Sequence, residues 1–183
     1  MDELRRKYIK RRRSLSPEEN RRLSEAACRR LMETEAYKKA KTIMIYRAMR
    51  GELSMAFLEE QAKEDGKLLL YPLCIENSQM LALRPLSEDS FRKGSFGIGE
   101  PDPERSQIVD PKDIDLVVCP CTAFDEDHYR LGMGGGYYDR FLPKCTKAVK
   151  CSIAFEIQKG DDIPHESWDQ PVDFCVTDRA IYA

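Results

Sequence analysis

Short apolar runs separated by helical segments constrain the fold of this chain most. Each run is long enough for a buried strand and too short for a helix. The runs are TIMIY (42–46), KLLLYP (67–72), IDLVVCP (114–120), KCSIAF (150–155) and DFCVT (173–177). Helices that alternate with buried strands indicate a parallel sheet covered on both faces. We therefore expect an α/β fold: a single three-layer domain over residues 1–183, with a mostly parallel central sheet flanked by helices.

The first part of the chain predicts two helices separated by a short break. In the first, Leu4 and Tyr8 share one face. The letters SPEE then mark the start of the second helix. Ser16 is the expected N-cap, Pro17 takes the first helical position, and Glu19 completes a capping box.

Functional loops are expected at one edge of the sheet. We predict a further helix over 55–62, a strand over 80–86 and a loop-rich stretch over 86–112. In open α/β sheets, ligands bind beyond the carboxyl ends of the strands. Glu52 and the glycine-rich run at 132–136 both follow predicted strands or lie in loops, as does the segment 97–101. We expect these three to meet at that edge.

Composition excludes several classes of protein. Hydrophobic residues make up 42% of the chain and charged residues 34%, which argues against wholesale disorder. No run approaches the roughly 20 apolar residues that span a bilayer, and the charged N-terminus lacks the apolar core of a secretory signal. The expectation is a cytoplasmic protein, a monomer, with no membrane partner.

Seven cysteines are scattered through apolar or strand-like segments. An odd number without a secretion signal argues against a disulfide framework. Cys119-Pro-Cys121 raises a metal or redox site as an alternative, but no second cysteine pair or histidine cluster lies near it in sequence. Buried, inert thiols are the favoured interpretation.

The formal net charge is -2, yet residues 5–13 hold seven cations. One interpretation is an arm that binds nucleic acid, and another is a solvated helix face. A third is that one or two of these cations contact a small phosphorylated ligand. The acidic balance of the whole chain disfavours nucleic acid as a partner.

The segment RLGMGGGYYDRFL, residues 130–142, has four glycines within five positions. It is neither a Rossmann fingerprint nor a P-loop, but glycines let successive N–H groups converge on an anion. Arg130 and Arg140 add cationic donors, and Asp139 suits a Mg²⁺ ion between the protein and phosphates. The alternative is a flexible turn whose tyrosines pack in the core. Phosphate binding is favoured, with Glu166, Asp169 and Asp173 as candidates for a second carboxylate.

This segment resembles the signature of the 5-formyltetrahydrofolate cyclo-ligase family, the methenyltetrahydrofolate synthetases. Other pieces match in order, so that the resemblance covers essentially the whole chain. They are LRRKYIKRRRSLS (4–16), GEL (51–53), GIGEP (97–101), DLVVCPCTAFD (115–125), AFEIQ (154–158) and IPHESWDQPVDFCVTD (163–178).

The resemblance implies conversion of 5-formyltetrahydrofolate to 5,10-methenyltetrahydrofolate, with ATP as co-substrate and with Mg²⁺. It implies two metal ligands, Asp139 and Asp169. The implied nucleotide contacts are Arg5, Arg130, Leu131, Gly132, Met133, Gly134, Gly135, Gly136, Tyr137 and Tyr138. The implied folate contacts are Arg47, Glu52, Met133, Gly134, Gly135, Gly136 and Tyr137.

The chain departs from the family pattern in two places. The family often has a lysine four residues before the arginine that Arg5 matches, and this chain has Met1 there. Neighbouring cations or the amino terminus are the candidates to replace that lysine. Inside the glycine run, Met133 and Gly135 stand where a basic or aromatic side chain occurs in the family, and we expect the affinity for ATP or folate to differ accordingly.

The implied reaction needs no covalent nucleophile on the protein. We expect the γ-phosphoryl group to activate the formyl oxygen and N10 to close the ring, with the protein supplying position and charge. His128 and His165 are weak candidates for a general base. Two rival functions stay open: a nucleic-acid-binding module that uses residues 5–13, and an ATP-independent relative of sugar-phosphate isomerases or CoA-transferases.

Overall fold

A computed structural model describes residues 1–94 and 97–183, and in this part of the chain the central sheet has eight strands. Their order is β12-β11-β10-β7-β1-β2-β3-β6. The five strands from β11 to β2 run parallel, whereas β12, β3 and β6 join antiparallel. The mostly parallel sheet is thereby confirmed. The strands are β1 (Thr42–Met44), β2 (Leu68–Ile75), β3 (Gln79–Pro85), β6 (Ser106–Val109), β7 (Leu116–Cys119), β10 (Val149–Ile153), β11 (Phe174–Val176) and β12 (Ile181–Tyr182).

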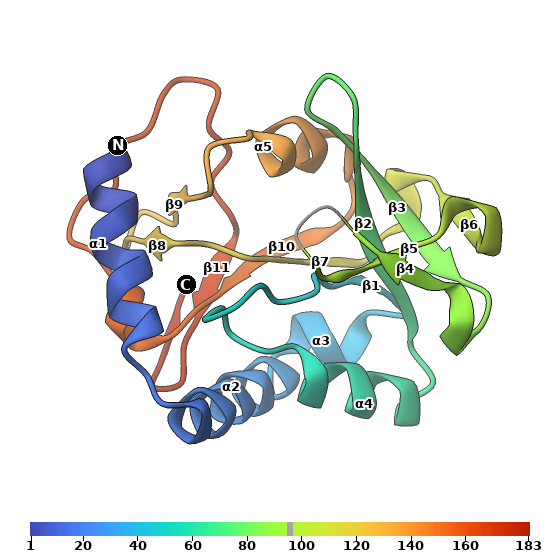
Figure 1. Cartoon of the computed structure of the whole chain (residues 1–183), viewed down its shortest axis with the longest axis horizontal. Helices are drawn as coiled ribbons and strands as arrows, with labels where there is room; N and C mark the ends of the chain where they lie inside the picture. The colour runs from blue at the N-terminus through green and yellow to red at the C-terminus, as the bar shows by residue number, and fades with distance from the viewer. Residues whose placement is uncertain (95–96) are drawn as a thin grey trace.

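Helices cover both faces of this sheet, as expected for three layers (Figure 1). Residues of α2, α3 and α4 pack on one face, and those of α5 and the 3-10 turn after it pack on the other. Helix α1 stands beside the short hairpin of β8 and β9. The helices are α1 (Asp2–Arg13), α2 (Pro17–Met32), α3 (Glu35–Lys39), α4 (Ala56–Glu64) and α5 (Tyr137–Phe141), and the hairpin strands are β8 (Ala123–Phe124) and β9 (Arg130–Leu131).

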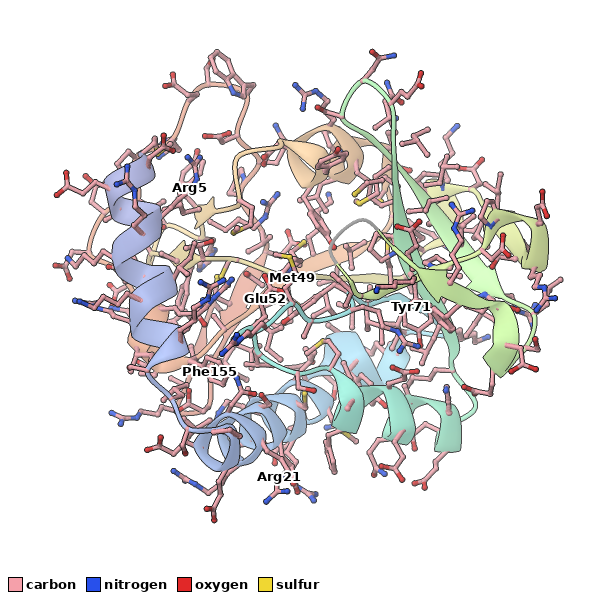
Figure 2. All side chains as sticks on the ribbon, in the orientation of Figure 1. Arg5, Arg21, Met49, Glu52, Tyr71 and Phe155 are labelled. Atoms are coloured by element: carbon pink, nitrogen blue, oxygen red, sulfur yellow. The ribbon has the colours of Figure 1, made fainter. Side chains whose placement is uncertain are left out.

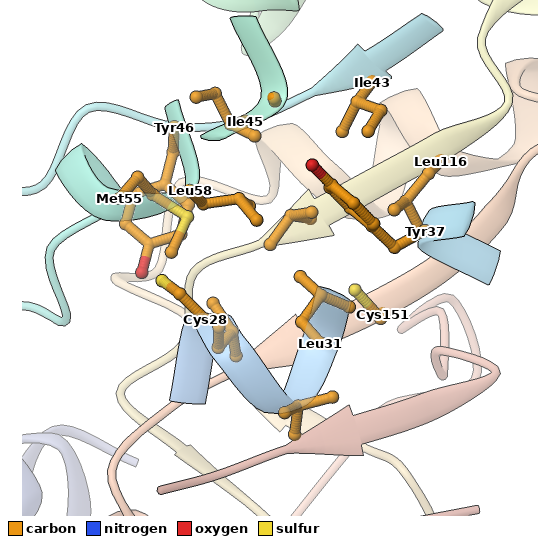
Figure 3. Close-up of a cluster of buried hydrophobic side chains, with 14 of the residues drawn as sticks. Cys28, Leu31, Tyr37, Ile43, Ile45, Tyr46, Met55, Leu58, Leu116 and Cys151 are labelled. Carbon is orange, nitrogen blue, oxygen red and sulfur yellow. The ribbon is translucent and has the colours of Figure 1, made fainter. Parts of the chain in front are cut away.

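The core under α2 follows from the two periodicities of helix and strand. Ile43 and Ile45 of the β1 segment point to the same face, and Met44 between them belongs to the core on the other face. Figure 3 shows Cys28 and Leu31, on one side of α2, in the same cluster as these isoleucines. All five side chains are fully buried. Alternation along β1 therefore supplies both apolar layers from one short run.

Two expectations about local structure need correction. The strand predicted to end at Pro72 continues to Ile75. Strand β1 ends opposite Leu70, so that Pro72 has a neighbouring strand, β3, on one side only. A proline, which has no N–H to donate, is tolerated at such a position. The stretch 86–112 is also more regular than predicted, although Ser95 and Phe96 lie outside the described residues. It contains β4 (Phe91–Lys93), β5 (Gly99–Pro101), β6 and the 3-10 turns Glu88–Ser90, Pro103–Arg105 and Pro111–Asp113. The remaining 3-10 turns are Leu142–Lys144 and Glu156–Gln158.

Among the described residues, no helix combines the length and the apolar character needed to cross a bilayer. The longest, α2, has 16 residues and is amphipathic, with charged side chains along its outer face.

The start of α2 has the capping box that the sequence predicts. The Glu19 N–H donates to the Ser16 hydroxyl at 3.1 Å, and the Ser16 N–H donates to the Glu19 carboxylate at 2.8 Å. Ser16→Ala removes one of these bonds, and we expect the free energy of unfolding to fall by about 1 kcal/mol. Urea denaturation measures this change. Ser16→Asp, which can still cap, is the matched control and should stay close to the wild-type value; an equal loss in both variants would contradict the capping account.

Candidate active site

The glycine-rich run, residues 132–136, links β9 to α5 and exposes its backbone. Gly134 and Gly136 have φ of 98° and 64°, a region that residues with a Cβ rarely adopt. A Cβ on Gly135 would lie 2.7 Å from the ring of Tyr137. Within residues 1–94 and 97–183, no carbonyl or side-chain acceptor engages the five N–H groups of this run. The run therefore offers free donors to a ligand.

Arg5 brings the predicted nucleotide-contacting helix to this run. Its Nε donates to the Gly132 carbonyl at 2.9 Å, and its guanidinium carbon lies 3.4 Å from the position that a Cβ on Gly134 would take. Figure 2 shows Arg5 on the side of α1 that faces β9. The structure thus places a cation directly beside the free backbone donors.

The two arginines around the run are engaged with the protein itself. Arg130 has only 3% of its side chain exposed, and its Nη2 lies 3.0 Å from Asp139 Oδ1. Arg140 Nη1 donates to the carbonyls of Gly135 and Gly136, each at 3.1 Å. The carboxylate of Asp139, which the sequence suggests for a metal, therefore also neutralises a buried guanidinium. Leu131, between these groups, is buried in a small cluster with Tyr8 of α1.

Tyr137 and Tyr138 begin α5 and pack against the core on that face of the sheet. The hydroxyl of Tyr138 is buried, and so is Arg130 Nε; neither has a hydrogen-bond partner among the described residues. Burial raises the pKa of Tyr138 well above its ordinary value. The hydroxyl therefore stays protonated at neutral pH.

The two predicted metal ligands come from neighbouring segments. The Gln170 N–H donates to Asp139 Oδ1 at 3.2 Å, so the chain neighbour of Asp169 lies against Asp139. Asp169 Oδ2 accepts the N–H of Glu166 at 2.8 Å. No group of three acidic, histidine or cysteine side chains suited to a metal is present in the described part of the chain. Two carboxylates fit a Mg²⁺ ion that arrives with phosphates, because Mg²⁺ takes its other ligands from phosphate and water.

Asp125, which the sequence analysis did not single out, anchors the loop that carries Asp169. It is 2% exposed, and its carboxylate accepts the N–H groups of Tyr129 at 2.9 Å and Ile163 at 2.8 Å. His165 of the same loop stacks on Tyr129, with ring centroids 3.5 Å apart. The backbone carbonyl of His128 accepts the Val172 N–H. The sequence offered one signal for the role of Asp125: it is an acidic residue directly after the apolar residues of β8.

Glu52 lies in the loop after β1, next to Met49 (Figure 2). It is 8% exposed, and its Oε2 accepts the Met49 N–H at 2.9 Å. Its Oε1 lies 3.4 Å from Nη2 of Arg12, which is itself 2% exposed. Sequence analysis grouped Arg12 with six other cations and did not separate it from them. Its spacing of seven residues from Arg5, which places both on one helix face, was the available signal.

A chain of contacts connects Glu52 to the glycine run, but Arg47 lies apart from that run, beside the β4–β5 pair. Thr122 Oγ1 donates to Met133 Sδ at 3.5 Å, and Arg12 Nη1 donates to the carbonyl of the preceding residue, Cys121. These contacts connect the glycine run to the Glu52 loop. Arg47 instead lies 3.9 Å over the ring of Phe91, the first residue of β4, whose partner strand is β5. Within the described residues, no hydrogen bond or ion pair joins Arg47 to the run.

Two hollows in the surface do not coincide with these residues. One, of about 350 Å³, is lined by Lys39, Asp115 and Lys147 near the amino ends of the parallel strands. The other, of about 390 Å³, lies between α4 and β3. The glycine run is the better candidate for a binding site, because the free donors and the paired charges lie there.

Comparison with known proteins decides the family. Residues 1–178 match the family description "5-formyltetrahydrofolate cyclo-ligase family". The chain belongs to this family. It is an enzyme of the ligase class.

Relatives of the family support the match along the whole chain. The 5-formyltetrahydrofolate cyclo-ligase of Escherichia coli K12 is 32% identical over 178 residues, which cover 94% of this chain and 97% of that protein. The mouse cyclo-ligase is 29% identical and covers 93% of this chain and 89% of that protein. The solved structure of Aquifex aeolicus 5,10-methenyltetrahydrofolate synthetase has a TM-score of 0.85 at 36% identity, covering 98% of this chain and 90% of that one. The Mycoplasma pneumoniae synthetase gives 0.80 at 26% identity, covering 97% and 98%.

The cysteines of this family member predict a simple labelling pattern. Six of the seven are buried, and Cys74 is exposed. Burial raises the pKa of Cys119 to about 12 and that of Cys121 to about 11, so both stay protonated thiols at neutral pH. We expect a thiol reagent at pH 7.5 to modify one cysteine rapidly in the native protein and all seven in denaturant. Rapid native modification of the Cys119–Cys121 pair, located by mass spectrometry, would restore the metal or redox interpretation.

The Arg130–Asp139 pair predicts a loss of stability. Asp139→Asn leaves the buried guanidinium without a counter-ion, and we expect the free energy of unfolding to fall by about 1–3 kcal/mol. Asp162→Asn, at an exposed position, is the control that should stay near wild type. Chemical denaturation of both variants without nucleotide or metal measures the difference. Equal stabilities would show that the pair contributes nothing to folding.

Proposed function

We propose that this enzyme converts 5-formyltetrahydrofolate to 5,10-methenyltetrahydrofolate, consuming ATP with Mg²⁺ and releasing ADP and phosphate. One observation carries the proposal: the unpaired backbone donors of residues 132–136 lie beside the guanidinium of Arg5, and the Asp139 carboxylate follows them in α5, in a chain of the cyclo-ligase family. The names of the relatives supply the substrate and the product.

The chemistry explains why a phosphate site belongs in such an enzyme. The formyl group on N5 is an amide, so its carbon is a poor electrophile and its oxygen a poor leaving group. Transfer of the γ-phosphoryl group to that oxygen, with release of ADP, makes the oxygen a good leaving group. N10 then attacks the carbon and loses its proton, and phosphate departs as the C–N double bond forms. The protein has to align the reactants and stabilise charge.

The residues have three roles in this proposal: they bind phosphate, metal or folate. The N–H groups of 132–136 and the guanidinium of Arg5 bind phosphate oxygens. Arg130, Leu131 and Tyr138 flank this phosphate-binding run on either side in the sequence. Asp139 and Asp169 hold the Mg²⁺ ion, which neutralises phosphate charge when bound. Glu52 accepts N–H groups of the pterin, Met133 to Tyr137 border the folate, and Arg47 contacts it from the side of Phe91.

We further propose a single domain that acts as a monomer in the cytoplasm without a nucleic-acid or membrane partner.

Arg5 and Arg12 favour this assignment over the nucleic-acid alternative. Both are among the seven cations of residues 5–13, and both point into the protein, where they contact Gly132 and Glu52. Arg12 pairs with a buried carboxylate and is therefore not free to neutralise a nucleic-acid backbone, and Arg5 is directed toward the glycine run. The contacts of these two residues therefore favour a role within the protein over a nucleic-acid surface.

A near-ultraviolet absorbance assay tests the proposal. The purified protein is mixed with 5-formyltetrahydrofolate and Mg²⁺, with and without ATP, because the methenyl product has a chromophore that the substrate lacks. We expect the product band to grow only with ATP and to disappear when a chelator removes Mg²⁺. Folded protein that binds nucleotide but produces no band would contradict the reaction; a band that grows without ATP would contradict the phosphate site.

A further inference from the structure

We propose that Arg12 is a positioning residue that holds the Glu52 carboxylate in the orientation in which it meets the pterin. The inference rests on the proposed function, because it assigns a task to a residue behind the folate-contacting carboxylate. Arg12 itself is not placed in contact with the substrate.

The contacts of Glu52 leave its carboxylate little freedom. One oxygen accepts the Met49 N–H at 2.9 Å, and the other lies 3.4 Å from Arg12 Nη2. The side chains of Arg12 and Glu52 are 2% and 7% exposed. Keeping a carboxylate charged at such a depth is costly without a cation beside it. Arg12 therefore supplies the opposite charge that offsets the cost of burying this carboxylate.

Arg12 is itself fixed at a second point. Its Nη1 donates to the carbonyl of Cys121 at 3.3 Å, while Nη2 faces Glu52. Because the guanidinium is planar and rigid, two contacts on two nitrogens define its plane. Because Nη2 faces the carboxylate of Glu52, the fixed guanidinium plane also restricts the orientation of that carboxylate. A lysine at this position would keep the charge but lose the fixed plane.

The Nε of Arg12 is a second indication that this residue has a functional role besides stabilising the fold. It is buried and has no hydrogen-bond partner among the described residues. Leaving a buried donor unsatisfied is unfavourable, and such groups often mark functional sites. The guanidinium is placed for its contacts with Glu52 and Cys121 rather than for full satisfaction of its own donors.

Arg12 also lies on the face of α1 that carries Arg5. Seven residues are close to two helical turns, so the two side chains project the same way, about 10 Å apart along the axis. Arg5 contacts the glycine run, and Arg12 contacts the Glu52 loop. One helix thereby positions groups for both substrates.

Substitution at Arg12 tests this role through the substrate constants. Arg12→Met preserves much of the side-chain length and removes the charge. We expect the KM for 5-formyltetrahydrofolate to rise about tenfold, with the KM for ATP within about twofold of wild type. Arg12→Lys should give an intermediate rise. Lys10→Met removes one charge from an exposed position of the same helix and should leave both constants unchanged.

A double variant separates positioning from an independent effect. If Arg12 acts through Glu52, Arg12→Met added to Glu52→Gln should not raise the folate KM beyond that of Glu52→Gln alone. A multiplicative further rise would overturn the inference. A purely structural Arg12 would lower the melting temperature and the amount of active enzyme but leave KM unchanged, and that result in both Arg12 variants would also overturn it. Wild-type protein that neither binds nor converts the folate would overturn the proposed function, and with it this inference.

Discussion

The inward-facing cations of α1 are the interaction on which the rest of the site depends. This helix carries more charge than any other segment, yet Arg5 and Arg12 turn toward the protein and Tyr8 between them is buried. Buried charge is tolerated only where it is paired. Arg12 pairs with Glu52 and with the Cys121 carbonyl, and Arg5 donates to the Gly132 carbonyl as well as to Asp2 of its own helix. Residues 52, 121 and 132 lie far apart in the sequence. Helix α1 therefore contacts three loops that the sequence separates.

The parallel sheet explains where those loops meet. Strands β1, β7 and β10 lie side by side and run in the same direction. The chain after β1 carries Glu52, and the chain after β7 carries Cys121, the β8–β9 hairpin and the glycine run. Segments that leave neighbouring parallel strands emerge at the same edge of the sheet. Loops of unrelated sequence thus become neighbours because of the order of the strands.

Local sequence was sufficient for features whose cause is local. The capping box of α2, the buried runs at 42–46 and 114–120 and the special backbone of the glycine run all follow from residues close together in the chain. The same reasoning failed for β4 and β5, which have three residues each and exist because they pair with each other. Neither has the length or the alternation that marks a strand in sequence.

Long-range pairing defines the parts of the site that sequence could not reveal. Apart from its spacing from Arg5, nothing local distinguishes Arg12 from Arg11 or Arg13; the approach of Glu52, 40 residues away, gives it a buried partner. The same holds for Asp125, whose partner Ile163 comes from a distant loop. Asp139 drew attention as a metal ligand, and its ion pair with Arg130 emerged only from the fold. Family resemblance assigns roles to residues, whereas the structure shows which residues support them.

Hydrogen exchange with and without Mg²⁺ and ATP tests the central claim most directly, namely that α1 and the glycine run together form the phosphate site. Exchange reports opening of individual backbone segments and does not depend on turnover. We predict slower exchange in peptides covering residues 1–13 and 130–138 when nucleotide is bound, with α3 unchanged. Nucleotide binding, established by calorimetry, that leaves both of these segments unprotected would contradict the account.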